Sequence, residues 1–325
     1  MTHEHIFTIT SKSDFLSVAL SVFRHQYANN SVYQEFCKHL KVHPERVTRL
    51  DQIPFLPIQF FKAKKILSTT ESPKITFTSS GTTGSSTSKH FVTDLNLYTQ
   101  SYRYAFEQFY GQPDEFCILA LLPSYLETEG SSLIYMVDDL IKESKHPKSG
   151  FFLNDFQLLK ETLEELKKTR TKTLLIGVSF ALLDFSEEYQ LELEDTIIME
   201  TGGMKGRRKE MIRPELHEKL MLGFGVNQVH SEYGMTELLS QAYSKGNGIF
   251  ECPPWMKVLV RDTEDALTIN GYEKTGGLNI IDLANLNSCS FIATQDLGKT
   301  FSNGTFEILG RFDHSDIRGC NLMAL

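Results

Sequence analysis

The sequence predicts an α/β fold built around a largely parallel β-sheet, on three observations. Between about residues 74 and 240, short β-rich runs alternate with amphipathic helical patterns, which is typical of parallel strands joined by helices. The run Phe116–Leu122 is apolar throughout, as expected for a strand buried on both faces. Beyond Gln241, short β segments with Gly and Asn turns follow and indicate a smaller antiparallel sheet or a barrel-like portion.

Helices are expected at the start of the chain. Apolar residues recur at helical spacing from about Lys12 to Leu40, with a second helix beginning near Ser31. Two prolines interrupt the aromatic segment at 53–61, which we interpret as packing. This helical lead-in covers about residues 1–60.

Strands and helices then alternate over about residues 74–240. The expected helices are Thr93–Phe109 (capped by Thr93 or Asp94), about Glu129–Glu143, Asp155–Thr169, a helix through Leu183, and about Arg208–Leu222 with Pro214 weakening its middle. The expected strands are Lys74–Thr78, Phe116–Leu122, Thr173–Gly177, Thr196–Met199 and Gly225–His230. The β-rich part, over about 241–325 with the C-terminal tail, is expected to contain Met256–Arg261, Leu278–Asp282, Ser290–Ala293 and Thr305–Leu309.

Composition narrows the class of function. The 325 residues, 41% of them apolar, fit one large domain or two small ones. The net charge of -8 is spread along the chain, so no nucleic-acid partner is indicated. Neither a signal peptide nor an apolar run near the ~18 residues of a membrane span is visible. The five cysteines are far apart and form no C-x-x-C pair, so we expect no zinc site or disulfide framework and a cytoplasmic location.

The stretch from Thr78 to Lys89 consists almost entirely of hydroxyl and glycine residues and lies between a predicted strand and a predicted helix. Glycines let successive N–H groups point into one concavity, which can hold a phosphate chain. A flexible linker is the alternative. The loop matches neither the Walker nor the Rossmann pattern. The residues expected to form the cradle are Ser79, Ser80, Gly81, Thr82, Thr83, Gly84 and Ser85.

Two further loops follow predicted strands, at 200–206 and 231–237, and ligands bind beyond the carboxyl ends of strands in such sheets. Gly202 and Gly203 permit close approach to a planar ring, with a plain turn as the alternative. Tyr233 is suited to stack on a base. Glu237 is suited to hold Mg²⁺, because hard cations prefer carboxylate oxygen; the alternative is an exposed carboxylate at a helix start.

A competing pattern is Gly177–Ala181, which approximates the G-x-S-x-G nucleophile elbow around Ser179 but ends in alanine. Its triad histidine would come from His217, His230 or His314, and nothing in the sequence selects among them. A buried serine at a helix start is the preferred interpretation.

Cys320 lies in a glycine-flanked tail beside Arg318. A partly ionised thiol there could act as a nucleophile. The alternative is a cysteine without a chemical role.

These stretches together resemble the adenylate-forming (ANL) superfamily. Ser80–Gly84 resembles its phosphate-binding signature, and Tyr233–Glu237 resembles its Y-G-x-T-E motif. Asp296–Gly298 and Gly310–Asp313 resemble its ribose-binding aspartate and the arginine at its interdomain hinge. The resemblance implies one adenylate-forming domain over residues 1–325. Its fold would be the large N-terminal domain of the superfamily, with mostly parallel sheets flanked by helices plus a smaller β-rich portion.

Within the superfamily, the chain is most similar to the LuxE-type acyl-protein synthetases. Glu200–Arg207, Glu232–Gln241 and Ser315–Cys320 carry this likeness, which extends over nearly the whole chain. Such enzymes activate a fatty acid as acyl-AMP and move the acyl group to a cysteine thiol, feeding a fatty-acid reductase partner. The resemblance implies that Cys320 is an acyl-accepting thiol.

Two departures from the superfamily pattern matter. Lys89 stands later than the lysine that normally follows the phosphate loop. The sequence also stops just beyond the hinge-like arginine, so the small C-terminal domain with its catalytic lysine is expected to be absent. Lys205, Arg207 and Arg208 are then candidates to offset the charge on the α-phosphate.

The resemblance assigns a role to each motif, with ATP as substrate and Mg²⁺ as cofactor. Residues 79–85 form the phosphate cradle, and Thr236 and Glu237 bind phosphate and Mg²⁺. Gly202, Gly203 and Tyr233 enclose adenine, and Gly234 and Met235 also belong to the nucleotide-binding residues. Asp296 binds the ribose hydroxyls, and Arg311 assists. The acceptor is Cys320 or the thiol of a partner such as a fatty-acid reductase or an acyl carrier. The alternative functions are an acyl- or aryl-CoA ligase, a non-catalytic nucleotide-binding subunit, and an ATP-independent serine hydrolase using Ser179.

Overall fold

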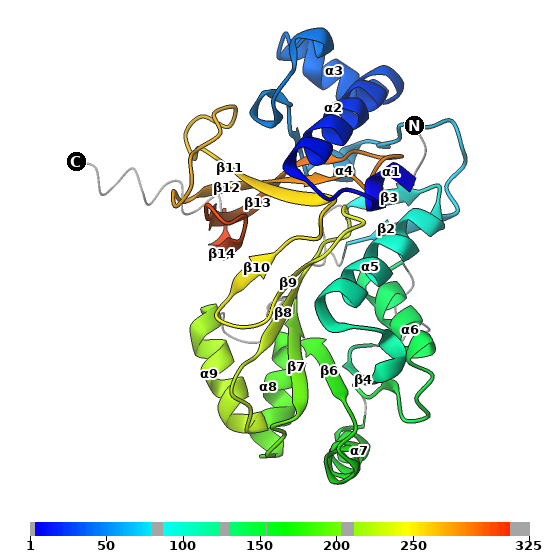
Figure 1. Cartoon of the computed structure of the whole chain (residues 1–325), viewed down its shortest axis with the longest axis vertical. Coiled ribbons are helices and arrows are strands. Elements are labelled where there is room, and N and C mark those ends of the chain that lie inside the picture. The colour runs from blue at the N-terminus through cyan, green and yellow to red at the C-terminus, as the bar shows by residue number, and fades with distance from the viewer. Residues whose placement is uncertain (1–3, 80–86, 124–129, 154, 203–210, 313–325) are drawn as a thin grey trace, which may run out of the picture.

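One β-sheet runs through most of the molecule (Figure 1). The computed structural model describes residues 4–79, 87–123, 130–153, 155–202 and 211–312. Within them, twelve strands form the sheet in the order β11-β12-β13-β14-β10-β9-β8-β7-β6-β4-β5, with β1 (Leu56–Pro57) beside β13. A separate hairpin consists of β2 (Ile75–Thr78) and β3 (Lys89–Val92). The predicted α/β fold class is confirmed.

One part of the sheet is parallel. Its strands are β4 (Cys117–Leu121), β5 (Gly150–Phe151), β6 (Thr173–Val178), β7 (Thr196–Thr201) and β8 (His230–Tyr233). All residues of β4 and β6 are buried, which explains their unbroken apolar sequences. The accompanying helices are α5 (Leu95–Tyr110), α6 (Ser132–Ser144), α7 (Phe156–Thr169), α8 (Ser179–Glu188) and α9 (Arg213–Phe224). Figure 1 shows α5 and α6 on one side of these strands and α8 and α9 on the other.

The rest of the sheet is antiparallel. Its strands are β9 (Ala242–Ser244), β10 (Ile249–Glu251), β11 (Met256–Arg261), β12 (Gly276–Asp282), β13 (Phe291–Thr300) and β14 (Phe306–Arg311). As predicted, the strands beyond Gln241 are antiparallel, but they do not form a smaller sheet of their own, because β9 pairs directly with β8. The chain reverses after Tyr233 and continues the same sheet in the opposite direction.

Helices at the N-terminus pack against the antiparallel part. They are α1 (Glu4–Phe7), α2 (Lys12–Asn29), α3 (Ser31–His39) and, after two short 3₁₀ turns at 44–46 and 50–52, α4 (Phe60–Ala63); a third 3₁₀ turn lies at 113–115. A capping box between Ser11 and Asp14 begins α2. The buried Gln26 of α2 donates hydrogen bonds to the carbonyls of Asn285 and Leu286 at 3.0 and 2.9 Å. These long-range bonds fix α2 against the loop between β12 and β13.

Three local predictions are revised by the structure. Asp94 caps α5 as expected, but the strand β3 separates the hydroxyl-rich loop from this helix. Pro214 stands in the first turn of α9, where its missing N–H costs nothing, and does not weaken the middle of a helix. The strand expected at 225–230 lies at His230–Tyr233, because Gly225 adopts a left-handed conformation and ends α9.

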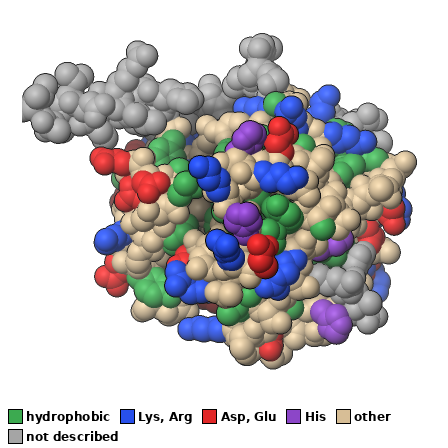
Figure 2. All heavy atoms as spheres, turned by 90° about the horizontal axis from the view of Figure 1, so that it is seen from above, with side chains coloured by type: hydrophobic (Ala, Val, Ile, Leu, Met, Phe, Trp, Pro, Cys, Tyr) green, Lys and Arg blue, Asp and Glu red, His purple; other side chains and the backbone are tan. Residues whose placement is uncertain are grey.

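The surface carries mixed charge. Figure 2, which looks onto the end of the molecule that carries α2 and α3, shows Lys and Arg side chains scattered among acidic, histidine and apolar ones. None of the helices in the described ranges combines the length and the apolar character of a membrane-spanning segment.

Candidate functional site

The hydroxyl-rich loop begins and ends on the β2–β3 hairpin. The backbone N–H of Ser79 donates to the carbonyl of Ser88 at 3.1 Å, and the N–H of Ser88 donates to the hydroxyl of Ser79 at 2.9 Å. These reciprocal bonds close the base of the loop. The rest of the predicted cradle, residues 80–85, lies outside the described residues.

The hairpin lies against the corner that follows β8. His90 of β3 is 1% exposed. Its Nδ1 is 2.8 Å from the carbonyl oxygen of Thr236, and its Nε2 is 3.0 Å from Oδ1 of Asn285. Asn285 in turn donates from Nδ2 to the carbonyl of Glu237 at 2.7 Å. The base of the loop and the Thr236–Glu237 corner, separated by about 150 residues in sequence, are therefore neighbours in the fold.

The Glu237 carboxyl is almost fully buried, with 5% of the residue exposed. Burial raises its pKa, while a hydrogen bond from the Ser88 side chain and the charges of Arg311 and Lys62 act in the opposite direction. A desolvated carboxylate is stabilised by positive charge nearby, which these side chains supply in part and a bound cation would supply in addition.

A second corner joins Tyr233 to the antiparallel strands. The hydroxyl of Tyr233 donates to Oδ2 of Asp296 at 2.7 Å, and Nε of Arg311 donates to Oδ1 at 3.0 Å. Asp296 and Arg311 are paired directly across β13 and β14. Each carboxylate oxygen keeps a second lone pair for an incoming hydroxyl. The Tyr233 ring meets Phe250 and Phe306 edge-on, so its orientation is fixed by packing.

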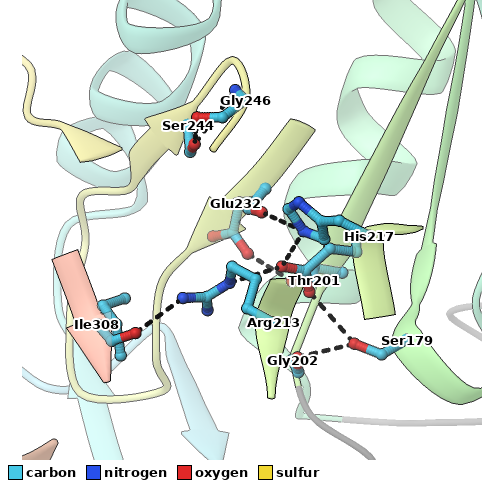
Figure 3. Close-up of polar contacts among 11 residues, drawn as sticks. Ser179, Thr201, Gly202, Arg213, His217, Glu232, Ser244, Gly246 and Ile308 are labelled. Carbon is cyan, nitrogen blue, oxygen red and sulfur yellow. Dashed lines mark hydrogen bonds and ion pairs between the residues drawn. The ribbon is translucent and has the colours of Figure 1, made fainter. Parts of the chain in front are cut away.

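A third group of polar side chains lies around the end of β7, and Figure 3 shows Ser179, Arg213 and His217 approaching it from α8 and α9. They converge on the Glu200 carboxylate: Ser179 Oγ at 3.2 Å, Arg213 Nε at 3.3 Å and His217 Nε2 at 3.6 Å. Burial opposes ionisation of Glu200, but the contacts with His217 and Arg213 outweigh it and lower its pKa. Arg213 also donates to the carbonyl of Ile308 at 3.0 Å.

This arrangement does not support Ser179 as a hydrolase nucleophile. Ser179 is buried, and its hydroxyl bonds to Glu200 and to the carbonyl of Gly202, both acceptors, at 3.2 Å. A nucleophilic serine needs a base that takes its proton, normally histidine. His217 instead contacts Glu200 and Ser231.

Glu232 lies beside this group at the end of β8. Thr201 Oγ1 donates to its Oε2 at 2.5 Å. Burial raises the pKa of Glu232 to about 7. A Cβ atom at Gly234 would lie 2.5 Å from Oε1 of Glu232, so the glycine of this motif leaves room for the carboxyl group behind it.

Hydrogen bonds to Asp282 fix the turn that follows Glu237. This fully buried carboxylate accepts from the N–H groups of Leu239 and Ser240 at 2.7 and 3.1 Å, and from the Ser240 hydroxyl at 2.5 Å. Trp255 Nε1 donates to Ser240 Oγ at 3.1 Å and to Ser101 Oγ at 2.9 Å. The turn is therefore tied to α5 of the parallel part.

The thiols of the described cysteines are poorly suited to nucleophilic attack. Burial raises the pKa of Cys117 to about 11 and those of Cys37, Cys252 and Cys289 to about 12. The thiolate is the reactive form. Cys320 lies outside the described residues.

Contacts join two sets of the predicted site residues that the structure describes: the base of the loop at Ser79 and Ser88 meets Thr236 and Glu237, and Tyr233 meets Asp296 and Arg311. Gly202 follows β7, which pairs with β8, and Gly234 and Met235 stand between the two corners in sequence. Gly203, Lys205, Arg207, Arg208 and Cys320 are not among the described residues. Lys89 is exposed at the start of β3.

Sequence reasoning missed His90, Asn285 and Lys62. For His90, the signal was available in part: it stands two residues after Ser88, and alternate residues of a strand share a face. Nothing local marks Asn285, whose contacts lie 195 and 48 residues away along the chain. Lys62 follows the aromatic segment that was interpreted as packing.

The described residues contain no group of three or more His, Cys, Asp or Glu side chains arranged to hold a metal ion. An open groove of about 710 Å³ lies elsewhere, lined by residues from 9–16, 49–51, 251–259 and 303–305. It includes none of the site residues above.

Solved structures share this fold. An open conformation of 2-hydroxyisobutyryl-CoA ligase, solved with 2-HIB-AMP and CoA, matches with a TM-score of 0.66 at 11% identity, over 93% of this chain and 70% of that chain. ATP-bound MatB from Rhodopseudomonas palustris matches with a TM-score of 0.55 at 19% identity, over 73% of this chain and 47% of that chain. At these identities the likeness shows the fold alone.

A curated relative gives a match in sequence. It is a long-chain-fatty-acid–luciferin-component ligase from Photorhabdus luminescens, 37% identical over 68 residues, which are 21% of this chain and 58% of that protein. The chain thus covers less than two thirds of this relative and of MatB. The model of one family, described as acyl-protein synthetase LuxE, matches residues 10–324. Since that match spans nearly all 325 residues, the chain belongs to the LuxE acyl-protein synthetase family.

Proposed function

We propose that this chain uses ATP to activate a fatty acid as an acyl-adenylate and then transfers the acyl group to a cysteine thiol. The observation that carries the proposal is the contact between the base of the hydroxyl-rich loop and the Glu237 corner, through Ser88 and His90. A triphosphate held by the loop would lie next to that carboxylate. The family membership and the shared ligase fold support the same reaction class.

In the first step, a carboxylate oxygen of the acid attacks the α-phosphorus of ATP, and the bond to pyrophosphate breaks. The protein mainly positions the reactants and stabilises charge. Ser79 and the loop hold the β- and γ-phosphates, Gly202 and Tyr233 border the adenine, and Asp296 accepts hydrogen bonds from the ribose hydroxyls. Lys205, Arg207 and Arg208 remain the proposed cations for the α-phosphate.

Magnesium fits the donor set at this corner. Mg²⁺ is usually held by one or two carboxylates together with substrate phosphates. Glu237 supplies one buried carboxylate, and Thr236 supplies a neighbouring hydroxyl. When bound, the ion would neutralise charge on the phosphates.

In the second step, a thiolate attacks the acyl carbon of the mixed anhydride, the carbon–oxygen bond to phosphate breaks, and AMP leaves. The thiol proton passes to solvent. Cys320 is the proposed acceptor within this chain, and the raised pKa values of the four described cysteines support this choice. A thiol on a fatty-acid reductase or an acyl carrier would then receive the acyl group.

The fatty-acid specificity rests on the family rather than on a cavity. One apolar void lies between α5, α6 and the sheet, lined by residues such as Phe106, Met136 and Met199, and its volume is about 10 Å³. This is the space of a single water molecule. A long acyl chain entering there would have to displace these side chains.

Carboxylate-dependent exchange of pyrophosphate into ATP tests the first step, with fatty, aryl and amino acids compared. We expect fatty acids to give the fastest exchange and Glu237→Gln to reduce it by about 100-fold or more, because a charged group that binds the reacting phosphates is lost. Glu251 is an exposed carboxylate on β10, so Glu251→Gln is the control and should keep the normal rate of pyrophosphate exchange. No exchange with any acid would contradict the proposal.

Labelled acid tests the second step. Cys320→Ser should keep exchange but lose the covalent label, while Cys252→Ser should keep both. A covalent label retained by Cys320→Ser would show that another residue accepts the acyl group. A label that appears only on coenzyme A would indicate a CoA ligase.

A further inference from the structure

His90 lies where three segments distant in sequence meet: the β2–β3 hairpin, the corner after β8 and the loop between β12 and β13. Its two ring nitrogens face the carbonyl of Thr236 and the amide oxygen of Asn285, at 2.8 and 3.0 Å. The amide nitrogen of Asn285 donates to the carbonyl of Glu237. Two consecutive backbone carbonyls of the corner are therefore held by two buried side chains.

The hairpin reaches the corner through a second contact on the same side. Ser88 and His90 are two residues apart in extended backbone, so their side chains point the same way. Ser88 bonds to the Glu237 carboxyl, while His90 bonds to the backbone beneath it. The side chain and the backbone of the corner are thus both fixed relative to the end of the hydroxyl-rich loop.

The other end of this connection is equally fixed. Asn285 is fully buried, and its own carbonyl accepts from Gln26 of α2 at 3.0 Å. The edge of the Phe61 ring packs against His90, with the ring centroids 5.8 Å apart. Burial lowers the pKa of His90, while the oxygen acceptors on Thr236 and Asn285 act in the opposite direction, because only the protonated ring has an N–H group on both nitrogens.

We propose that His90 and Asn285 are positioning residues, which hold the Thr236–Glu237 corner against the β2–β3 hairpin so that the Glu237 carboxylate meets Mg·ATP in a fixed orientation. This inference rests on the proposed function. Neither residue touches the reacting atoms. Their contribution is the alignment of the metal-binding carboxylate with the phosphates, and misplacement of a catalytic group by about 1 Å can cost 100-fold in rate.

The test measures ATP affinity with and without Mg²⁺, by calorimetry, and the KM for ATP in pyrophosphate exchange. His90→Phe keeps the ring but loses both polar contacts, and Asn285→Leu removes the second contact. We expect both to weaken Mg²⁺-dependent ATP binding and raise KM by about 10- to 100-fold, and to leave Mg²⁺-free ATP binding unchanged. His90→Asn retains an amide near the Nδ1 position and should restore part of the loss.

Tyr33→Phe is the matched control, since it removes another buried hydrogen bond, from Tyr33 Oη to the carbonyl of Pro54 at 2.6 Å, in the N-terminal helices. Tyr33→Phe should lower the stability of the fold without changing the ratio between the ATP affinities measured with and without Mg²⁺. The single tryptophan, Trp255, is buried, so its emission reports whether each variant is folded. If His90→Phe does not fold, His90→Asn and Asn285→Leu give the same comparison.

Unchanged Mg²⁺ dependence and KM in the folded variants would overturn the inference, as would a loss of stability alone. Failure of the proposed function is distinguishable, because it would appear in the unmodified chain as no Mg²⁺-dependent ATP binding and no exchange. That result would overturn both proposals.

Discussion

Glu232 shows what a single buried carboxyl group contributes at the end of a strand. It is 8% exposed, accepts from Thr201, and lies against the backbone of Gly234. Burial raises its pKa from 4.5 to about 7. The folded protein therefore binds a proton at Glu232 at pH values where the unfolded chain has released it.

The sign of the resulting pH dependence follows from linkage. The raised pKa of Glu232 favours the native state below pH 4.5, and this contribution is lost as the pH rises toward 7. The shift corresponds to a loss on the order of 3 kcal/mol in the free energy of unfolding. The free energy of unfolding of Glu232→Gln, measured in urea at pH 5 and at pH 7, should not show this loss. The exposed-carboxylate control Glu251→Gln should retain it, and equal pH dependence in both variants would contradict the assignment.

At the scale of elements, Arg213 joins α9 to two parts of the sheet. Its guanidinium contacts Glu200 of β7 and the carbonyl of Ile308 in β14, and lies 5.1 Å from the centroid of Phe250 in β10. The side chain of Glu200 is 4% exposed and that of Arg213 is 25% exposed. The Arg213–Glu200 pair is thus largely removed from water, and each charge is stabilised by the other.

Arg213→Met should lower the free energy of unfolding by about 3 kcal/mol, because it leaves the buried Glu200 carboxylate with weaker compensation. Arg49→Met is the control: its partner Asp51 forms an exposed pair with it, with 67% and 43% of the side chains accessible, so about 1 kcal/mol or less is expected. Equal losses in the two variants, measured by chemical denaturation, would show that burial of the Glu200 pair is not important.

Many elements could be predicted from the sequence because their signals are local. Asp94 and Asp155 cap α5 and α7 as their positions suggest, and β6 has the unbroken apolar run of a buried strand. The sequence does not predict β3, because this strand has only four residues, pairs with β2 alone and carries no periodic pattern of its own. The role of Pro214 depended on where α9 begins, which local sequence marks poorly.

At the scale of the whole molecule, the important feature is that the sheet continues from the parallel part into the antiparallel part. The change in sequence character at Gln241 suggested a boundary, but the β8–β9 pairing crosses it. Trp255 also bridges both parts through Ser101 and Ser240. We therefore propose that residues 4–312 behave as one cooperative unit.

Unfolding in urea should then show one transition. The far-UV circular dichroism, which follows all helices and strands, and the fluorescence of Trp255 should have the same midpoint. A β-rich part that unfolds separately would instead give two midpoints, with Trp255 reporting only one of them. A domain boundary near Gln241 would then be the better description.

The site was predictable as a set of motifs but not as an arrangement. The loops containing Gly202 and Glu237 follow predicted strands, and Asp296 was found through the resemblance to the adenylate-forming superfamily. The placement of the Glu237 corner against the β2–β3 hairpin involves His90 and Asn285, whose partners are distant in sequence. Long-range contacts of this kind leave no periodic pattern, so only the folded chain reveals them.

Asp282 has a consequence for how a nucleotide would meet this protein. By anchoring two backbone amides and a hydroxyl just beyond Glu237, it settles the shape of that turn during folding, before any ligand arrives. The conformational entropy of ordering these residues is then lost once in the lifetime of the molecule and not at each round of catalysis. A ready-built corner of this kind favours rapid capture of ligand over slow adjustment around it.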